Sequence, residues 1–424
     1  MRRRVREQPA RRLTARIEKI GAQGDGVARG DGWEVFTPLT APGDLAVIEA
    51  RGRSGKLIEL IESGPDRAAA PCAHYGICGG CALQHVNLAF QRRWKRERIV
   101  EALAAAGLDA PVSDSVATLA ASRRRATFAV RKSRDGALLG FNARRSSEVV
   151  DISGCLVLEP KLVEKLSALR SLAATIPARE FDLAATLCEN GLDVHAIGDR
   201  IAELNGRERV LTADAARNAG CVRLSVNHAP IVTFAPPVIH IDGLSLAPGP
   251  GAFLQASRDG EGALIALVKE ACAGAARIAD LFSGCGTFSL PLARTASVLA
   301  VDSDKAGLEA LGVAVRQAQS SGIALKSVQT EMRDLIERPL TGAELKNFEA
   351  IVFDPPRAGA KEQAHEIANA RAPVVVGVSC NPATFARDAR MLADGGYTLS
   401  QVTPIDQFVY SPHVELIGVF RRKR

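Results

Sequence analysis

Aromatic side chains are scarce in this 424-residue chain, where phenylalanine, tryptophan and tyrosine together make up 4% of the sequence. Stacking many bases along a protein surface needs many aromatic rings, so extended base stacking is not favoured. Long apolar runs are lacking too: no stretch approaches the length of a membrane span, and no apolar segment follows the basic N-terminus as in a secretory signal. We therefore expect a cytoplasmic protein with no membrane partner.

Acidic residues are in the minority, because 54 lysines and arginines face 47 aspartates and glutamates and leave a formal net charge of +7. The basic residues cluster, for example at 92–98, 123–125 and 144–145. Such clusters in a basic protein indicate a polyanion as partner. The cysteine count is odd, and nine cysteines in a non-secreted chain favour thiols or ligands over disulfides.

The chain is too long for one ordinary domain, and its pattern changes twice. Residues 1–65 contain short alternating runs punctuated by glycine and proline, which predict an OB-like barrel of about five strands. Residues 66–245 predict a central α+β domain, mostly antiparallel. Residues 246–424 alternate strands with helices, which predicts a doubly wound α/β domain with an antiparallel pair at its end.

Three cysteines lie within ten residues of the central region, in the sequence CAHYGICGGCALQH. Cys72, Cys78 and Cys81 have the spacing C-x5-C-x2-C, and Cys155 is the best candidate for a fourth ligand. Four thiolates suit zinc or an iron–sulfur cluster. The three-plus-one arrangement is more typical of a cubane cluster, while His74 offers an alternative ligand for zinc.

The segment GVSCNPAT at 377–384 carries a thiol at a strand end. The apolar run before it predicts a buried parallel strand and residues 385–392 predict a helix, so Cys380 would lie at the edge where open α/β sheets bind ligands. The helix N-terminus would favour the nucleophilic thiolate. Asp354, followed by two prolines and Arg357, ends the preceding strand, and Glu415 lies in the last strand pair. Two carboxylates and a guanidinium would thus meet the thiol.

The turn DLFSGCGTF at 280–288 would let the backbone approach a ligand closely. It lacks the third glycine of the dinucleotide fingerprint, which disfavours a nicotinamide cofactor. Asp302 ends the next strand, where a carboxylate can accept both hydroxyls of a ribose. Together with the Asp-Pro-Pro segment at 354–356, these features resemble class I S-adenosylmethionine methyltransferases.

The resemblance becomes close when further motifs are added: GAFLQAS (251–257), DLFSGCGTFSLP (280–291), FDPPRAG (353–359), SCNPAT (379–384) and HVE (413–415). With these the chain resembles the RNA uracil-5-methyltransferase family. The upstream cysteines resemble those of its 23S ribosomal RNA branch, which carries a [4Fe–4S] cluster and a TRAM domain. GDGVAR, VFTP and APGD, within residues 24–44, resemble the TRAM domain, an RNA-binding barrel.

The resemblance implies a role for each site residue. It implies that Cys380 is the nucleophile and Glu415 the base, and that S-adenosyl-L-methionine is the methyl donor. It implies that the donor site is lined by Gln255, Phe282, Asp302 and Asp354. It further implies that the [4Fe–4S] cluster is held by Cys72, Cys78, Cys81 and Cys155. The expected partner is RNA, above all 23S ribosomal RNA, and we expect a monomer.

The chemistry of uracil explains these residue types. C5 of uracil is a poor nucleophile, and thiolate addition at C6 makes an enolate that activates C5. After methyl transfer a base must remove the C5 proton so that the thiolate can leave, and a carboxylate fits that step. Reaching both faces of the base requires the nucleotide to be unstacked, and Phe253 is a candidate to pack on it.

Two other functions stay open at this point. One is a transfer RNA uracil-5-methyltransferase, against which the cysteines and the barrel argue. The other is a non-catalytic RNA-binding assembly factor built on the same fold, against which the presence of both Cys380 and Glu415 argues. An adenine N6-methyltransferase is disfavoured, because Arg357 stands where an aromatic residue would follow the Asp-Pro-Pro segment.

Overall fold

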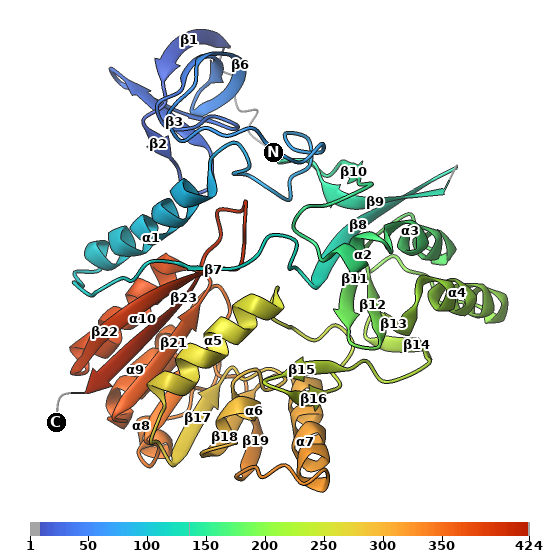
Figure 1. The fold of residues 1–424 in the computed structure, drawn as a ribbon, viewed down its shortest axis with the longest axis vertical. Coiled ribbons are helices and arrows are strands. Elements are labelled where there is room, and N and C mark those ends of the chain that lie inside the picture. The colour runs from blue at the N-terminus through green and yellow to red at the C-terminus, as the bar shows by residue number, and fades with distance from the viewer. Residues whose placement is uncertain (1–8, 135, 423–424) are drawn as a thin grey trace, which may run out of the picture.

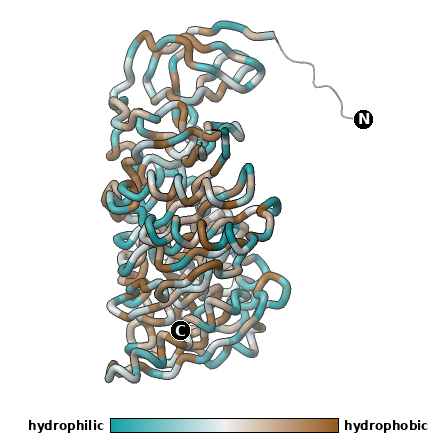
Figure 2. Tube along the Cα trace, turned by 90° about the vertical axis from the view of Figure 1, so that its right-hand side faces the viewer, coloured by the Kyte–Doolittle hydropathy of each residue, from teal (hydrophilic) through white to brown (hydrophobic). Residues whose placement is uncertain are grey.

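The computed structural model describes residues 9–134 and 136–422, so the basic residues at 1–8 and 423–424 lie outside the described residues. Figure 1 shows an N-terminal sheet at one end, a central sheet beside it, and a large C-terminal sheet at the other end. Figure 2, turned by 90°, shows hydrophobic and hydrophilic segments alternating along the whole trace. Among the helices of the described chain, none combines the length and apolar content that a membrane crossing requires.

The N-terminal sheet has, within the described residues, six strands in the order β1-β5-β6-β4-β3-β2. One strand more is present than the predicted five, because the pair at 19–20 is too short to show a periodic pattern. Its small core of alanine, valine and isoleucine side chains fills one face. The strands are β1 (Arg11–Arg16), β2 (Lys19–Ile20), β3 (Gly26–Gly30), β4 (Trp33–Thr37), β5 (Leu45–Arg51) and β6 (Ser54–Glu62).

The central sheet has the order β10-β9-β8-β11-β12-β13-β14 and is antiparallel except between β12 and β13. Helices α3 and α4 pack against one another beside it. The elements are β8 (Arg125–Ser133), β9 (Gly136–Asn142), β10 (Val149–Asp151), α2 (Pro160–Val163), α3 (Leu166–Thr175), β11 (Glu180–Cys188), β12 (Gly191–Ile197), α4 (Gly206–Ala219), β13 (Cys221–Val226) and β14 (Ala229–Thr233). A hairpin of β15 (Ile239–Ile241) and β16 (Leu244–Leu246) leads to the C-terminal sheet.

The C-terminal sheet has the order β19-β18-β17-β20-β21-β23-β22-β7. Its first five strands are parallel and β23 is antiparallel to both neighbours. The elements are α5 (Arg258–Ala271), β17 (Arg277–Leu281), α6 (Ser289–Leu292), β18 (Ser297–Asp302), α7 (Lys305–Ser320), β19 (Val328–Met332), α8 (Gly342–Leu345), β20 (Ala350–Phe353), α9 (Lys361–Ala370), β21 (Val374–Ser379), α10 (Pro382–Asp394), β22 (Tyr397–Asp406) and β23 (Glu415–Arg422).

Both faces of this sheet are buried, as its continuous apolar strands require. In β20, Ala350 and Val352 join the core under α5, α6 and α7, while Ile351 and Phe353 join the core under α8, α9 and α10. This layering confirms a mixed α/β fold. The strand order reverses between β17 and β20, so ligands are expected at the carboxyl ends of these strands.

Two elements from the region before the central sheet lie against the C-terminal sheet. Helix α1 (Leu88–Ala105) buries Ile99 and Leu103 in the core beneath α10, and β7 (Val116–Ala117) pairs with β22 at the sheet edge. At the start of α1, Trp94 packs in a cluster with Ile20 of the N-terminal sheet. Helix α1 therefore connects two sheets that are far apart in the sequence.

Candidate active site and cysteine cavity

Cys380 lies directly after β21, and its side chain is half-buried at the carboxyl edge of the sheet. The strand stops here because Pro382 opens α10 and Asn381 caps it, accepting the backbone N–H of Ala383. Burial raises the pKa of the Cys380 thiol to about 11, with Glu415 and Asp354 adding to the shift and Arg357 opposing it. Burial and the two carboxyl groups therefore outweigh the expected favourable effect of the helix N-terminus on the thiolate.

Two carboxyl groups lie near this thiol. Asp354 follows β20 directly, and Glu415 is the first residue of β23, which pairs with β21 so that Leu416 faces Ser379. Glu415 is only 4% exposed. Burial raises the pKa of both acids, and the charge of Asp354 raises the pKa of Glu415 further. The structure thus brings together the thiol and the two acids predicted from the sequence.

A chain of side-chain amides joins the two acids. Gln407 donates from Nε2 to Glu415 Oε2 at 2.9 Å and to Gln255 Oε1 at 3.0 Å. Gln255 in turn donates to Asp354 Oδ2 at 3.4 Å. Gln407 was missed from the sequence, although a signal existed: β22 runs antiparallel to β23, so the end of β22 had to lie beside Glu415.

The carboxyl ends of β17 and β18 hold the other predicted residues. Phe282 adopts a left-handed backbone with φ 61°, a conformation that is strained for a phenylalanine and common at binding sites. Asp302 accepts the backbone N–H of Gly284 at 2.8 Å and that of Asp304 at 2.7 Å, which fixes its carboxylate at the edge. Helix α7 approaches this turn so closely that a Cβ at Gly307 would lie 3.0 Å from the Gly284 carbonyl oxygen.

A buried acid connects these residues to the thiol side of the site. Asp280 accepts the Ser289 hydroxyl at 2.6 Å, while its other carboxyl oxygen has no hydrogen-bond partner. Burial raises the pKa of Asp280 to about 7, and the nearby charges of Asp354 and Asp302 contribute. Asp302 and Asp354 therefore both lie close to Asp280.

Two consecutive arginines, Arg124 and Arg125, hold the segment that carries Gln255. Arg124, fully buried, pairs with Glu261 of α5 at 2.6 Å and donates to the Gln255 carbonyl at 3.3 Å. Arg125 donates to the Leu254 carbonyl and stacks on Phe253 with its guanidinium 5.2 Å from the ring centre. Phe253 is 69% exposed, so a large apolar ring is presented beside the site.

The four cysteines predicted as ligands line one cavity of about 50 Å³. Its walls include Phe141, Ile152 and Val157, and His74 also lines it. Burial raises the pKa of Cys78, Cys81 and Cys155, and proximity of the other thiols adds to each shift. The thiols do not converge on one point: in the described residues no group of three or more acidic, histidine or cysteine side chains is placed to hold a single metal ion.

Comparisons with known proteins agree with this architecture. Residues 252–424 match the family model described as tRNA (Uracil-5-)-methyltransferase. A protein of Brucella suis named as an uncharacterized RNA methyltransferase is 43% identical, over 96% of this chain and 97% of the relative. The 23S rRNA (uracil(1939)-C(5))-methyltransferase RlmD of Chromohalobacter salexigens is 32% identical, over 96% of this chain and 88% of the relative.

A solved structure shares the fold. The tRNA (uracil-54, C5)-methyltransferase of Pyrococcus abyssi, crystallised with S-adenosyl-L-homocysteine, aligns with a TM-score of 0.72 and 24% identity, covering 96% of this chain and 100% of that chain. The sequence relatives align over most of their own length, and the family model covers the C-terminal sheet apart from β7. The chain therefore belongs to the RNA uracil-5-methyltransferase family.

Proposed function

We propose that this protein transfers a methyl group from S-adenosyl-L-methionine to C5 of a uracil in RNA. The observation that carries the proposal is the cluster at the carboxyl edge of the sheet, in which Cys380 lies beside the buried acids Glu415 and Asp354. A thiol beside a buried carboxyl matches the two steps that C5 methylation requires, nucleophilic addition and proton removal.

The proposed reaction begins with addition of the Cys380 sulfur to C6, which breaks the C5–C6 double bond and places the electron pair in an enolate. C5 then takes the methyl group, and the sulfonium of the donor is released as a neutral thioether. Glu415 accepts the proton from C5, the double bond re-forms, and the sulfur leaves C6. Since the free thiol has a raised pKa, we expect substrate binding to drive its deprotonation.

The donor is assigned to the neighbouring strand ends. The Asp302 carboxylate accepts two backbone N–H groups and can accept further hydrogen bonds, as binding a ribose diol requires. Phe282, Gln255 and Asp354 complete the predicted donor site. The solved relative was crystallised with the demethylated form of the same donor, which supports this assignment.

The cysteine cavity is proposed to hold a [4Fe–4S] cluster through Cys72, Cys78, Cys81 and Cys155. Four thiols lining one largely apolar cavity fit such a cluster, because the cluster spreads its ligands around a cube and does not draw them to one atom. The group would tie two distant segments together. Zinc, with His74 as an additional ligand, is the alternative.

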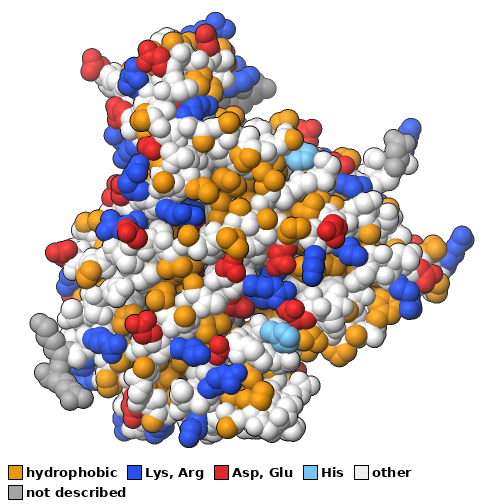
Figure 3. Space-filling view, in the orientation of Figure 1, with side chains coloured by type: hydrophobic (Ala, Val, Ile, Leu, Met, Phe, Trp, Pro, Cys, Tyr) orange, Lys and Arg blue, Asp and Glu red, His pale blue; other side chains and the backbone are white. Residues whose placement is uncertain are grey.

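The substrate is proposed to be 23S ribosomal RNA, and the protein a cytoplasmic monomer. The relative named as a 23S rRNA methyltransferase matches most of the chain, which supports the ribosomal substrate. The N-terminal sheet is proposed to be a TRAM-type RNA-binding module. Figure 3 shows hydrophobic side chains gathered between this sheet and the central sheet, with basic and acidic side chains around them.

The test uses purified protein, methyl-labelled donor, and either 23S ribosomal RNA or bulk transfer RNA from a strain lacking the gene. Label should enter ribosomal RNA as 5-methyluridine at a single position, and Cys380→Ala should abolish it. Label in transfer RNA alone would identify the alternative enzyme. RNA binding without transfer to either substrate would support the assembly factor and contradict the proposal.

A further inference from the structure

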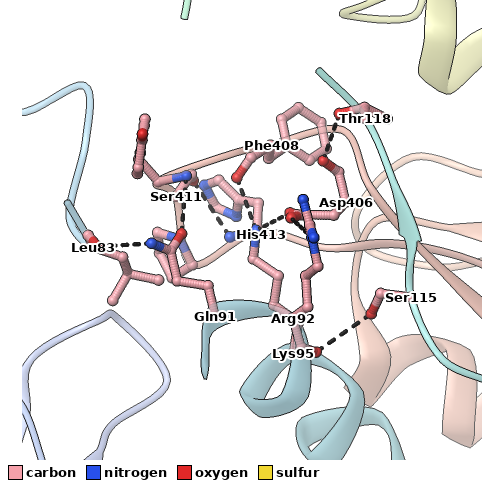
Figure 4. A network of polar contacts seen from close by, with 12 residues as sticks. Leu83, Gln91, Arg92, Lys95, Ser115, Thr118, Asp406, Phe408, Ser411 and His413 are labelled. Atoms are coloured by element: carbon pink, nitrogen blue, oxygen red, sulfur yellow. Dashed lines mark hydrogen bonds and ion pairs between the residues drawn. The ribbon is translucent and has the colours of Figure 1, made fainter. Parts of the chain in front are cut away.

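The loop between β22 and β23, residues 407–414, is held from outside the C-terminal sheet. Figure 4 shows side chains of α1 directed at this loop and at the end of β22. Lys95 is fully buried and donates from Nζ to Asp406 Oδ1 at 2.5 Å and to the Phe408 carbonyl at 2.8 Å. A buried ammonium with one carboxylate and one carbonyl as partners fixes the backbone on both sides of Gln407.

Other contacts fasten the rest of the loop. The Tyr410 N–H donates to Gln91 Oε1 of α1, and Arg98 donates to the Pro412 carbonyl at 2.6 Å. The Tyr410 carbonyl accepts two N–H groups, from Ala82 at 2.9 Å and Leu83 at 3.0 Å, directly after the cysteine loop. The position of the loop is therefore set by segments more than 300 residues earlier in the chain.

Gln407 is the one residue of this loop whose side chain reaches both halves of the proposed active site. Its amide donates to the proposed base Glu415 and to Gln255, the residue beside Asp354. It is 2% exposed, so water does not replace these bonds easily. A donor to the ionised carboxylate stabilises that form, and this hydrogen bond lowers the pKa of Glu415 against the effects of burial and Asp354.

We infer that Gln407 is a positioning residue for the base, and that the buried Lys95–Asp406 ion pair holds the loop from which Gln407 reaches both Glu415 and Gln255. The inference rests on the proposed function. Gln407 keeps the carboxyl aimed at the C5 proton and favours its ionised form, while Lys95 acts only through the loop. Asp354 and Cys380 are titratable groups near the base, and Arg357 lies near Cys380.

The first test compares Gln407→Leu with the wild type in single-turnover and steady-state methylation over a range of pH. A misplaced base should lower kcat about 10- to 100-fold. The KM for RNA should stay within about twofold, because binding contacts are untouched. The midpoint of the rise of kcat with pH should move to higher pH, and an RNA adduct that already carries the methyl label should accumulate because proton removal is slowed. Gln401→Leu, which replaces an exposed glutamine of the preceding strand β22, is the matched control.

The second test addresses the ion pair with Lys95→Met and with Lys95→Met/Asp406→Asn, which leaves no buried unpaired charge if the single variant fails to fold. The double variant should show the same accumulation of methylated adduct and the same shift of the pH midpoint as Gln407→Leu. A uniform loss of kcat with an unshifted midpoint and no adduct would mean that the loop is merely structural, and wild-type kinetics in Gln407→Leu would also overturn the inference. Failure of the proposed function would look different, because the wild type itself would then make no 5-methyluridine.

Discussion

At the scale of single residues, the arrangement separates the roles proposed for Cys380 and Glu415. The thiol is half-buried and open to a substrate, whereas the Glu415 carboxyl is enclosed and held by Gln407. The nucleophile must be accessible to the incoming uracil. The group that accepts the C5 proton acts only after the covalent adduct has formed. Loss of either residue should therefore stop the reaction at a different stage.

Glu415→Gln should trap the reaction after methyl transfer. Addition and methylation need only the thiol and the donor, so they should proceed, but the C5 proton then has no acceptor and elimination stalls. The product is RNA bound covalently to Cys380, seen as a slow band on a denaturing gel that carries methyl label. Cys380→Ala should give no such band. An adduct without the label, or rapid turnover of Glu415→Gln, would identify another base, with Asp354 the next candidate.

The same carboxyl makes folding stability depend on pH. Burial and Asp354 raise the pKa of Glu415 from 4.5 to about 8. Between these values the folded protein keeps a proton that the unfolded chain releases, so the free energy of unfolding falls as pH rises through that window. Glu415→Gln has no such proton, so its melting temperature should fall less than that of the wild type between about pH 5 and about pH 8. Glu59→Gln, on an exposed strand, should follow the wild type, and parallel curves for all three proteins would rule out the shift.

The sequence analysis identified the candidate site residues that belong to recognisable motifs. It missed Gln407, which belongs to none. Cys380, Asp354 and Glu415 each follow or begin an apolar strand, so their meeting at one edge could be predicted from strand order. Gln407 follows a strand in the same way but belongs to no recognised motif. Its importance depends on the side-chain rotamers that let one amide reach two partners, and these are not encoded in any local pattern.

At the scale of elements, helix α1 is the feature that the sequence did not place. The basic cluster at 92–98 indicated a polyanion as partner, yet Lys95 is buried against Asp406 and Arg98 donates to the Pro412 carbonyl. A lysine in a basic run carries no sign that it is buried, because only a partner far away in the chain makes its burial tolerable. The pairing between β7 and β22 could not be predicted either, because the two strands are also far apart in the sequence.

Loss of the cluster ligands in the cysteine loop should also affect residues outside the loop. If a [4Fe–4S] cluster binds, anaerobically purified protein should be brown and contain about four iron atoms per chain. Cys78→Ser or Cys155→Ser should lose the colour, and hydrogen exchange should rise at 82–83, whose amides hold the Tyr410 carbonyl. Cys272→Ser, a buried cysteine far from the cavity, should keep its iron. Stoichiometric zinc without labile sulfide would exclude the cluster.

At the scale of the whole molecule, the N-terminal sheet is joined to the rest through a small apolar contact and a few ion pairs. The Trp94 indole of α1 donates to the Ile20 carbonyl at 3.2 Å, and Asp25 pairs with Arg144 and Arg145 of the central region. Deleting residues 1–65 would uncover Trp94 and its apolar neighbours, so weaker RNA binding by a truncated protein could reflect instability. Substitutions on the exposed face of the sheet separate the two causes.

The replacement Arg11→Gln/Arg12→Gln/Arg51→Gln therefore tests whether this sheet binds RNA. These three arginines are exposed on the paired strands β1 and β5, and Arg11 stacks on Trp33 at 5.5 Å. If each contacts a phosphate of unpaired RNA, the slope of log affinity against log salt should become shallower by about 2, because each contact releases about 0.7 counterion. Donor binding, measured by calorimetry, should not change, since its proposed residues lie at the C-terminal sheet.

The control is Glu49→Gln/Glu59→Gln on the N-terminal sheet, which should leave the slope as it is. An unchanged slope in the arginine variant, with a melting temperature equal to that of the wild type, would show that RNA is held by the central and C-terminal sheets alone.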